Sequence, residues 1–182
     1  MTDGSKFFSG IETARCLIRE ITEDDIDALF NLYAQPGVTD FIEPLYSREE
    51  EIEYRRLYVD NIYRVYGFGL WGVFLKTTGE LIGQNGIEYR EGFTWDTADL
   101  GYVIHPLYRG LGLCKETTEA VLKYATDATA LDYVQARIRD DNTASIHVCR
   151  GFGFIPTSRM SGDERVYIKP LHGGKVADRI DG

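Results

Sequence analysis

A glycine-containing loop, residues 108–114 with the sequence YRGLGLC, constrains the fold of this 182-residue chain more than any other feature. It lies between a strand pattern, residues 96–104, and an amphipathic helix pattern that starts at Gly112 and ends near Ala128. A further strand pattern follows at residues 134–138. Strand, helix and strand in this order predict a right-handed crossover that joins two parallel strands.

The other segments predict helices in the first third of the chain and antiparallel strands after it. Apolar residues recur at helical spacing after Thr22 and again after Ser47, where Ser47 and Glu50 form a capping box. We expect the second helix to bury a stripe made of Ile52, Val59, Ile62, Tyr63 and Tyr66. Its glutamates should stay in solvent and favour the helix dipole: Glu49, Glu50, Glu51 and Glu53. Strand patterns at 69–75 and 81–89, a short helix at 143–150, and a closing hairpin at 154–160 and 165–168 complete one α/β domain.

The composition favours one folded domain and disfavours some function classes. Hydrophobic residues make up 43% of the chain, which is enough for a buried core. The 20 lysines and arginines and 29 aspartates and glutamates give a formal net charge of −9, which disfavours binding to nucleic acid through phosphate neutralisation. An acidic surface serves solubility in most proteins and suits a cationic partner in some. We expect the domain to span residues 14–170, between tails at residues 1–13 and 171–182.

The three cysteines, Cys16, Cys114 and Cys149, are widely spaced and form no C-x-x-C pair. No histidine or cysteine lies near them at zinc spacing, so we expect reduced thiols and no metal site. The first residues lack the apolar stretch of a signal peptide, and the apolar run at residues 67–75 is too short to span a bilayer. We therefore expect a cytoplasmic protein, monomer or homodimer, with neither membrane nor nucleic acid as a partner.

The loop at residues 108–114 has the chemistry of a pyrophosphate site. Gly110 and Gly112 permit a tight turn with outward-pointing N–H groups, next to the positive end of the following helix. The loop lacks the third glycine of the dinucleotide fingerprint and the Gly-Lys-Ser/Thr of a P-loop. A Rossmann dehydrogenase and a nucleoside triphosphatase are therefore disfavoured, and an ordinary glycine turn remains an alternative.

In its context the loop resembles that of the GNAT superfamily of acyl-CoA-dependent N-acetyltransferases, which reads Arg/Gln-x-x-Gly-x-Gly/Ala at a strand-to-helix junction. Downstream, Asn142-Thr143-Ala144-Ser145 and Gly153-Phe154 are similar to a segment of the ribosomal-protein N-terminal acetyltransferase branch (RimJ/RimL-like). Upstream, residues 99–104 and 17–25 are similar to strands and a helix start of that branch. The resemblance covers about residues 14–170. It implies a GNAT-like mixed, mostly antiparallel twisted sheet of roughly six to seven strands, with about four helices and one parallel βαβ crossover.

The resemblance also implies how acetyl-CoA binds as a co-substrate. The pantetheine would lie along the strand at Tyr102, Val103 and Ile104, where the two parallel strands separate. Asn142 would bond to the pantetheine arm or the acetyl region, and Ser145 would lie near the thioester sulfur. The pyrophosphate would rest on the amides of the loop residues Arg109, Gly110, Leu111, Gly112, Leu113 and Cys114.

Two residues depart from the family pattern. Cys114 stands where the loop usually has glycine or alanine, which leaves slightly less room. Cys149 stands seven residues after Asn142, where many GNAT proteins have a general-acid tyrosine, and Ser145 is the substitute that the RimJ/RimL-like branch uses. Direct attack of an amine on a thioester needs no covalent intermediate, so we expect neither cysteine to be a nucleophile.

The general base is open between Asp99 and Glu88, which lie on neighbouring expected strands. A partly buried carboxylate can have a raised pKa and accept a proton from the attacking amine, whereas a solvent-facing one has no such role. We expect structural roles for His105 and His147. An aromatic set either lines a pocket for a cationic amine or belongs to the core: Tyr58, Tyr63, Tyr66, Phe68, Trp71, Phe93 and Trp95.

These observations predict an N-acetyltransferase that moves acetyl from acetyl-CoA to a primary amine, either a protein N-terminal α-amine or a small amine. A non-catalytic sensor or assembly module that binds CoA or acyl-CoA is the alternative. The choice of acceptor depends on the segments at residues 41–46 and 90–97, whose composition does not specify a substrate.

Overall fold

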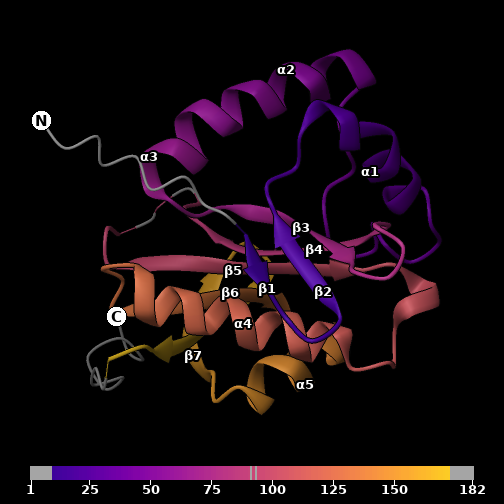
Figure 1. Cartoon of the computed structure of the whole chain (residues 1–182). Helices are drawn as coiled ribbons and strands as arrows, with labels where there is room; N and C mark the ends of the chain where they lie inside the picture. The colour runs from indigo at the N-terminus through magenta and orange to yellow at the C-terminus, as the bar shows by residue number, and fades with distance from the viewer. Residues whose placement is uncertain (1–9, 91, 93, 173–182) are drawn as a thin grey trace, which may run out of the picture.

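A single eight-stranded sheet with helices on both faces organises the computed structural model, which describes residues 10–90, 92 and 94–172 (Figure 1). The strands follow the order β1-β2-β3-β4-β5-β6-β8-β7 across the sheet. Neighbouring strands are antiparallel, except for the parallel pair of β5 and β6. The strand bounds are β1 Ile11–Glu12, β2 Cys16–Arg19, β3 Leu70–Leu75, β4 Leu81–Glu88, β5 Thr97–Ile104, β6 Tyr133–Arg139, β7 Ile155–Ser161 and β8 Glu164–Pro170.

The expected fold class is confirmed, with eight strands in place of the expected six to seven. Strand β1 lies in the stretch that the sequence pattern assigned to the N-terminal tail, and it pairs with β2 through Ile11↔Ile18 and Glu12↔Leu17. A strand of two residues carries no readable alternation, so the hydrophobic pattern gives no sign of it.

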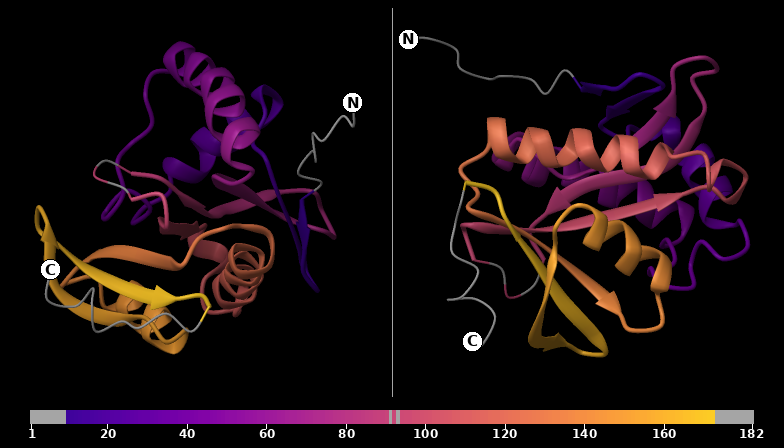
Figure 2. Two further views of the ribbon diagram at one scale, coloured as in Figure 1. Left: turned by 90° about the vertical axis from the view of Figure 1, so that its left-hand side faces the viewer. Right: turned by 90° about the horizontal axis from the view of Figure 1, so that it is seen from below.

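The helices form two layers, one on each face of the sheet. Helices α1 (Ile26–Tyr33) and α2 (Arg48–Tyr58) cover one face, and α2 continues through a π-helical turn (Val59–Tyr63) into α3 (Arg64–Tyr66). Helices α4 (Leu113–Ala128) and α5 (Thr143–Gly151) cover the other face (Figures 1 and 2).

Two adjacent residues of β4 show how the strand serves both layers. The Tyr33 hydroxyl of α1 donates to Gln84 Oε1 at 2.6 Å. Asn85 Nδ2 donates in the opposite direction, to Thr117 Oγ1 at 3.0 Å and Thr118 Oγ1 at 2.9 Å of α4. Because successive side chains of a strand point to opposite faces, β4 sends polar groups into both helix layers.

The hydrophobic core lies mainly between the sheet and α4. Its fully buried members include Trp71, Ile87, Val121 and Ala125, each 0% exposed. A smaller cluster beneath α1 consists of Ile21, Leu29, Leu32, Val38, Phe74 and Leu81. The two clusters pack the helices against both faces of the sheet, and this packing fixes the positions of the central strands.

The parallel pair of β5 and β6 separates soon after it begins. Its residue pairs are Thr97↔Tyr133, Ala98↔Val134 and Asp99↔Gln135, whereas β5 continues to Ile104 and β6 to Arg139. Beyond Asp99, β6 remains paired with β8 on its other side as far as Arg139↔Glu164. The backbone of β5 from Leu100 to Ile104 therefore borders an opening between the separated strands β5 and β6.

Helix α2 buries an ion pair where the sequence pattern predicts a solvated face. Glu51 is 1% exposed and Arg55 is 6% exposed, and Arg55 Nε donates to Glu51 Oε1 at 2.7 Å. The expectation that Glu51 lies in solvent was wrong, because the helix turns this carboxylate towards the sheet. Of the predicted apolar stripe, Tyr63 is buried, whereas Ile52, Val59, Ile62 and Tyr66 are half-buried.

We predict that this pair is sensitive to loss of one partner. Glu51→Gln leaves the Arg55 charge buried without its carboxylate and should lower the free energy of unfolding by about 3–5 kcal/mol. The exposed pair of Asp60 and Arg64 has the same spacing, so Asp60→Asn is the matched control and should change stability by less than about 1 kcal/mol. Urea unfolding measures both variants, and equal losses would contradict the prediction.

Candidate active site

The glycine loop connects the open end of β5 to the start of α4. A 3₁₀ turn, Pro106–Tyr108, follows β5, and the His105 side chain caps it by accepting from Leu107 N at 3.2 Å. Gly110 and Gly112 then take φ values of +75° and +77°, in the left-handed region that glycine occupies without strain. Gly112 is the N-cap of α4, so the first amides of a sixteen-residue helix face outward from the loop. Backbone amides at the start of a helix are a suitable arrangement for an anion.

Arg109 turns back into the protein from this loop. Its Nε donates to Ile104 O at 3.0 Å, and its Nη2 donates to Gly37 O at 3.0 Å. The guanidinium therefore joins the loop to the end of β5 and to the turn after α1. Its side chain therefore holds the loop in place, so only the backbone amides of the loop remain available to an anion.

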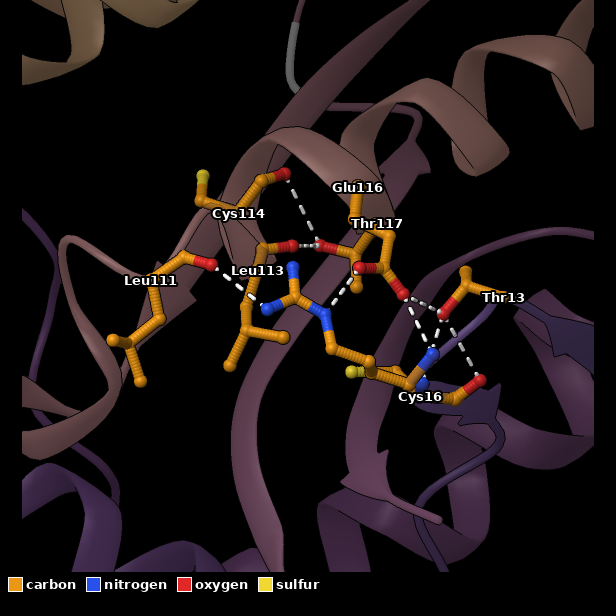
Figure 3. A network of polar contacts seen from close by, with 8 residues as sticks. Thr13, Cys16, Leu111, Leu113, Cys114, Glu116 and Thr117 are labelled. Carbon is orange, nitrogen blue, oxygen red and sulfur yellow. Dashed lines mark hydrogen bonds and ion pairs between the residues drawn. The ribbon is translucent and has the colours of Figure 1, made fainter.

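A polar network fastens the other side of the loop to the start of β2 (Figure 3). Arg15 Nη1 donates to Leu111 O at 2.9 Å, and Arg15 Nε donates to Glu116 Oε2 at 2.7 Å. Glu116 Oε1 accepts from Thr13 Oγ1 at 2.6 Å and from Arg15 N at 2.8 Å. Burial raises the pKa of Glu116, but the hydrogen bonds from Thr13 and Arg15 outweigh it, so the net pKa lies below its ordinary value of 4.5.

Helix α5 begins where β6 has separated from β5. Asn142 is its N-cap, and Asn142 Oδ1 accepts from Ser145 N at 3.1 Å. The amide oxygen of Asn142 therefore serves the helix start, while Ser145 lies in the first turn and is half-buried.

Tyr102 crosses from β5 to this helix. Its hydroxyl donates to Ser145 O at 3.2 Å and lies 3.7 Å from Cys149 Sγ. Burial raises the pKa of the Cys149 thiol to about 11 and that of the Cys114 thiol to about 11. Both cysteines are thus protonated at neutral pH, which agrees with the expectation that neither is a nucleophile.

Asp99 and Glu88 form a cross-strand pair on β5 and β4. Asp99 is 2% exposed and fully engaged, because Gln135 Nε2 donates to Oδ2 at 3.0 Å and Arg137 Nε donates to Oδ1 at 2.8 Å. Glu88 instead accepts from the Tyr58 hydroxyl at 2.9 Å. Burial raises the pKa of Glu88, and the Tyr58 hydrogen bond and the positive charge of Arg90 oppose it only in part.

Tyrosines and the buried ion pair of α2 surround Glu88. Burial raises the pKa of Tyr33 to about 12, with the negative charges of Glu51 and Glu88 adding to it and Arg55 opposing it. Gln84 is fully buried, and its Nε2 has no hydrogen-bond partner within the described part of the chain. The face of the sheet under α1 and α2 thus holds the Glu88 carboxylate, phenol groups and the buried pair of Glu51 and Arg55.

The sequence profile described as "Acetyltransferase (GNAT) domain" matches residues 15–155. The chain belongs to the GNAT acetyltransferase family. A curated relative, the uncharacterized N-acetyltransferase YoaA of Bacillus subtilis (strain 168), is 29% identical over 149 residues, or 81% of this chain and 83% of that protein. The expected GNAT identity and the class of acyl-CoA-dependent acetyltransferase are confirmed.

Solved structures share the fold at low sequence identity. A GNAT-family acetyltransferase of Bacillus anthracis aligns with a TM-score of 0.72 and 22% identity, covering 89% of this chain and 98% of its own. RimL, a ribosomal α-N-protein acetyltransferase solved in complex with coenzyme A, aligns with a TM-score of 0.76 and 18% identity, covering 91% and 100%. Ribosomal-protein acetyltransferases are thus among the structural neighbours of this GNAT chain.

The structure brings together most of the residues that the sequence singled out. The loop, the open end of β5 and the start of α5 meet on the face covered by α4, whereas Glu88 and Asp99 lie on the face covered by α2. His147 is exposed and lines a separate groove of about 830 Å³ between α5 and the β7–β8 hairpin. Phe93 lies outside the described residues, and Trp95 is 71% exposed.

Sequence reasoning missed the buried polar residues Gln84 and Arg55 on the face of the sheet under α1 and α2. Gln84 and Asn85 interrupt an otherwise apolar strand, and that interruption was the available signal for Gln84. Arg55 gave no signal in the sequence, because most of its neighbours in α2 are charged as well.

The structure also bears on metals and membranes. Within residues 10–90, 92 and 94–172, no group of three or more His, Cys, Asp or Glu side chains is placed to hold a metal ion. All three cysteines are free. Among the described helices, none has the length and apolar character needed to cross a membrane.

We predict that the network around Glu116 depends on pH. A lowered folded-state pKa means that the carboxylate stabilises the fold fully above pH 4.5 and loses this contribution as the pH falls through the folded-state pKa. Glu116→Gln should therefore lower the free energy of unfolding by about 1–3 kcal/mol at pH 7 and by progressively less below pH 4.5, where the native carboxyl also becomes neutral.

Urea unfolding from pH 7 to about pH 3.5 measures this difference. Glu119→Gln, on an exposed residue of the same helix, is the control and should change stability by less than about 0.5 kcal/mol. A pH-independent effect of Glu116→Gln would contradict the prediction.

Proposed function

We propose that this GNAT protein transfers acetyl from acetyl-CoA to a primary amine by direct attack of the amine on the thioester. The observation that carries the proposal is the early separation of β5 from β6 next to a glycine loop that opens α4. A thioester held in this opening is accessible from both faces of the sheet. Positioning of two reactants in this way supplies a large part of the rate of a bimolecular transfer.

The cofactor would be held largely by backbone groups. At Tyr102, Val103 and Ile104, β5 is paired with β4 but has no strand partner on its β6 side, where Arg109 Nε donates to Ile104 O, and we assign the pantetheine to this free edge. The loop amides from Gly110 to Cys114, with the end of the α4 dipole, offer a site for the pyrophosphate. Asn142 and Ser145 would flank the acetyl end, with Ser145 near the sulfur. This arrangement requires no metal.

Glu88 is the better candidate for the general base. Its carboxylate accepts one hydrogen bond, from Tyr58, and burial raises its pKa, which makes it a stronger base than an ordinary glutamate. Asp99 is held by Gln135 and Arg137, so protonation there would disrupt a buried ion pair. We therefore assign proton removal from the amine to Glu88 and a structural role to Asp99.

The acceptor is a primary amine, either a protein N-terminal α-amine or a small amine. The acidic, tyrosine-lined interior around Glu88 supports a cationic amine in general. The likeness to RimL, a ribosomal α-N-protein acetyltransferase, supports the protein N-terminus. A CoA-binding sensor predicts instead stabilisation by CoA without turnover of any amine.

Cofactor binding tests the loop assignment. Gly112→Glu places a carboxylate at the loop and should weaken CoA affinity more than about 100-fold, measured by calorimetric titration or by the loss of CoA-dependent thermal stabilisation. Gly79→Glu is the matched control, because Gly79 has a similar φ of +73° but lies in the β3–β4 turn. Both variants carry the same backbone strain, so equal CoA affinity in the two would contradict the assignment.

The pH dependence of turnover tests Glu88. Because Glu88 must be ionised to act as a base, kcat/KM should fall as the pH drops through its raised pKa, so the acidic limb lies above pH 4.5. Glu88→Gln should lower kcat/KM about 100-fold or more and abolish that limb. Thiol release from acetyl-CoA, with spermidine and a short peptide bearing a free α-amine as acceptors, measures both effects.

Asp99→Asn separates the two carboxylates in the same assay. This variant should lower stability through the unpaired Arg137 and keep the acidic limb. Loss of the limb in Asp99→Asn and its retention in Glu88→Gln would reverse the assignment.

A further inference from the structure

A phenol lies at the opening of the sheet, opposite the carboxylate face. We propose that the Tyr102 hydroxyl protonates the thiolate that leaves when acetyl is transferred, an inference that rests on the proposed function. Amine attack on a thioester releases a thiolate, and its protonation makes the cleavage effectively irreversible at the site. The proton donor must lie at the sulfur and remain protonated at neutral pH.

The geometry of Tyr102 meets the first requirement. Tyr102 lies three residues beyond Asp99, the last β5 residue paired with β6, so its side chain begins at the edge of the opening. Alternation along β5 puts it on the same face as Ala98 and Leu100, which belong to the core under α4. Its hydroxyl reaches Ser145 O at 3.2 Å and Cys149 Sγ at 3.7 Å, so the phenol bridges the opening from β5 to α5.

Tyr102 also meets the second requirement. Burial raises its pKa above the ordinary value of 10.0, so the phenol stays protonated at neutral pH. Its contact with the Cys149 sulfur shows that the hydroxyl already accommodates a sulfur atom at hydrogen-bonding distance. The bond to Ser145 O fixes the ring, and a hydroxyl rotates about its C–O bond to reach a neighbouring thiolate.

The other groups at the opening are less suitable. The Ser145 hydroxyl is an aliphatic alcohol and a much weaker acid than a phenol, and Ser145 contributes its carbonyl oxygen to hold Tyr102. Cys149 is completely buried, behind the Tyr102 hydroxyl. Glu88 and Asp99 lie on the opposite face of the sheet and Glu88 takes the proton of the amine. Tyr102 thus supplies the acid from the face opposite the base.

Atoms and protons balance in this transfer of acetyl. The amine nitrogen bonds to the carbonyl carbon, the carbon–sulfur bond breaks, and the Tyr102 proton moves to sulfur to give free CoA thiol. The ammonium form of the acceptor loses two protons in all. Glu88 takes one and passes it to solvent, and the other restores the Tyr102 phenol.

The test compares Tyr102→Phe with a matched tyrosine variant. Tyr102→Phe should lower kcat about 100-fold or more, with the KM for acetyl-CoA and the affinity for CoA within about twofold of the unmodified protein. Tyr124 lies on α4, and its hydroxyl likewise donates to a backbone carbonyl, Gly67 O, at 2.6 Å. The control variant Tyr124→Phe removes this phenol. It should change kcat by less than about twofold, and Ser145→Ala should change kcat less than Tyr102→Phe does.

A change of leaving group separates an acid from a merely structural tyrosine. The selenoester analogue of acetyl-CoA releases a selenolate, which is far less basic and leaves without a proton. With this donor the loss caused by Tyr102→Phe should shrink to less than about fivefold. An equal loss with both donors, or a kcat in Tyr102→Phe no lower than in Tyr124→Phe, would overturn the inference alone. Absence of turnover in the unmodified protein with spermidine and the peptide would overturn the proposed function as well.

Discussion

The ion pair between Asp99 and Arg137 sits where the two parallel strands part, and the rest of the site depends on that point. Asp99↔Gln135 is the last residue pair of β5 and β6, and Arg137, two residues further along β6, reaches back to Asp99 at 2.8 Å. Gln135 adds a second bond to the same carboxylate. These buried contacts hold the strands together up to Asp99, and pairing with β8 carries β6 away beyond it.

The opening between β5 and β6 is bordered by the two faces of the sheet, which differ in their chemistry. The α4–α5 face offers backbone amides, a phenol and two protonated thiols, which suit the phosphates, pantetheine and leaving group of a CoA thioester. The α1–α2 face offers Glu88 with tyrosines, which suit an amine that must lose a proton. In the proposed reaction both reactants would meet at the gap between β5 and β6, so that one displacement step would suffice.

The features within one segment of sequence were predictable, and those that join distant segments were not. Strand, loop and helix periodicity located the turn at Gly110 and Gly112, because backbone conformation there depends on local residue type. The inward turn of Arg109 depends on Gly37, and the reach of Tyr102 depends on α5, some forty residues later. Glu51 looked like one more glutamate of a solvated helix start. Only the tertiary structure shows that it is buried with Arg55.

The net charge of −9 is compatible with an anionic cofactor because Arg15 neutralises Glu116, a carboxylate next to the loop. Glu116 lies in the first turn of α4, where its charge alone would repel a pyrophosphate. Arg15 pairs with that carboxylate and with Leu111 O, so the network cancels the nearby negative charge and fixes the loop together. The helix amides then face a locally neutral site within an acidic protein. In the proposed reaction the remaining acidity would act on the other reactant, because an acidic surface raises the local concentration of a cationic amine.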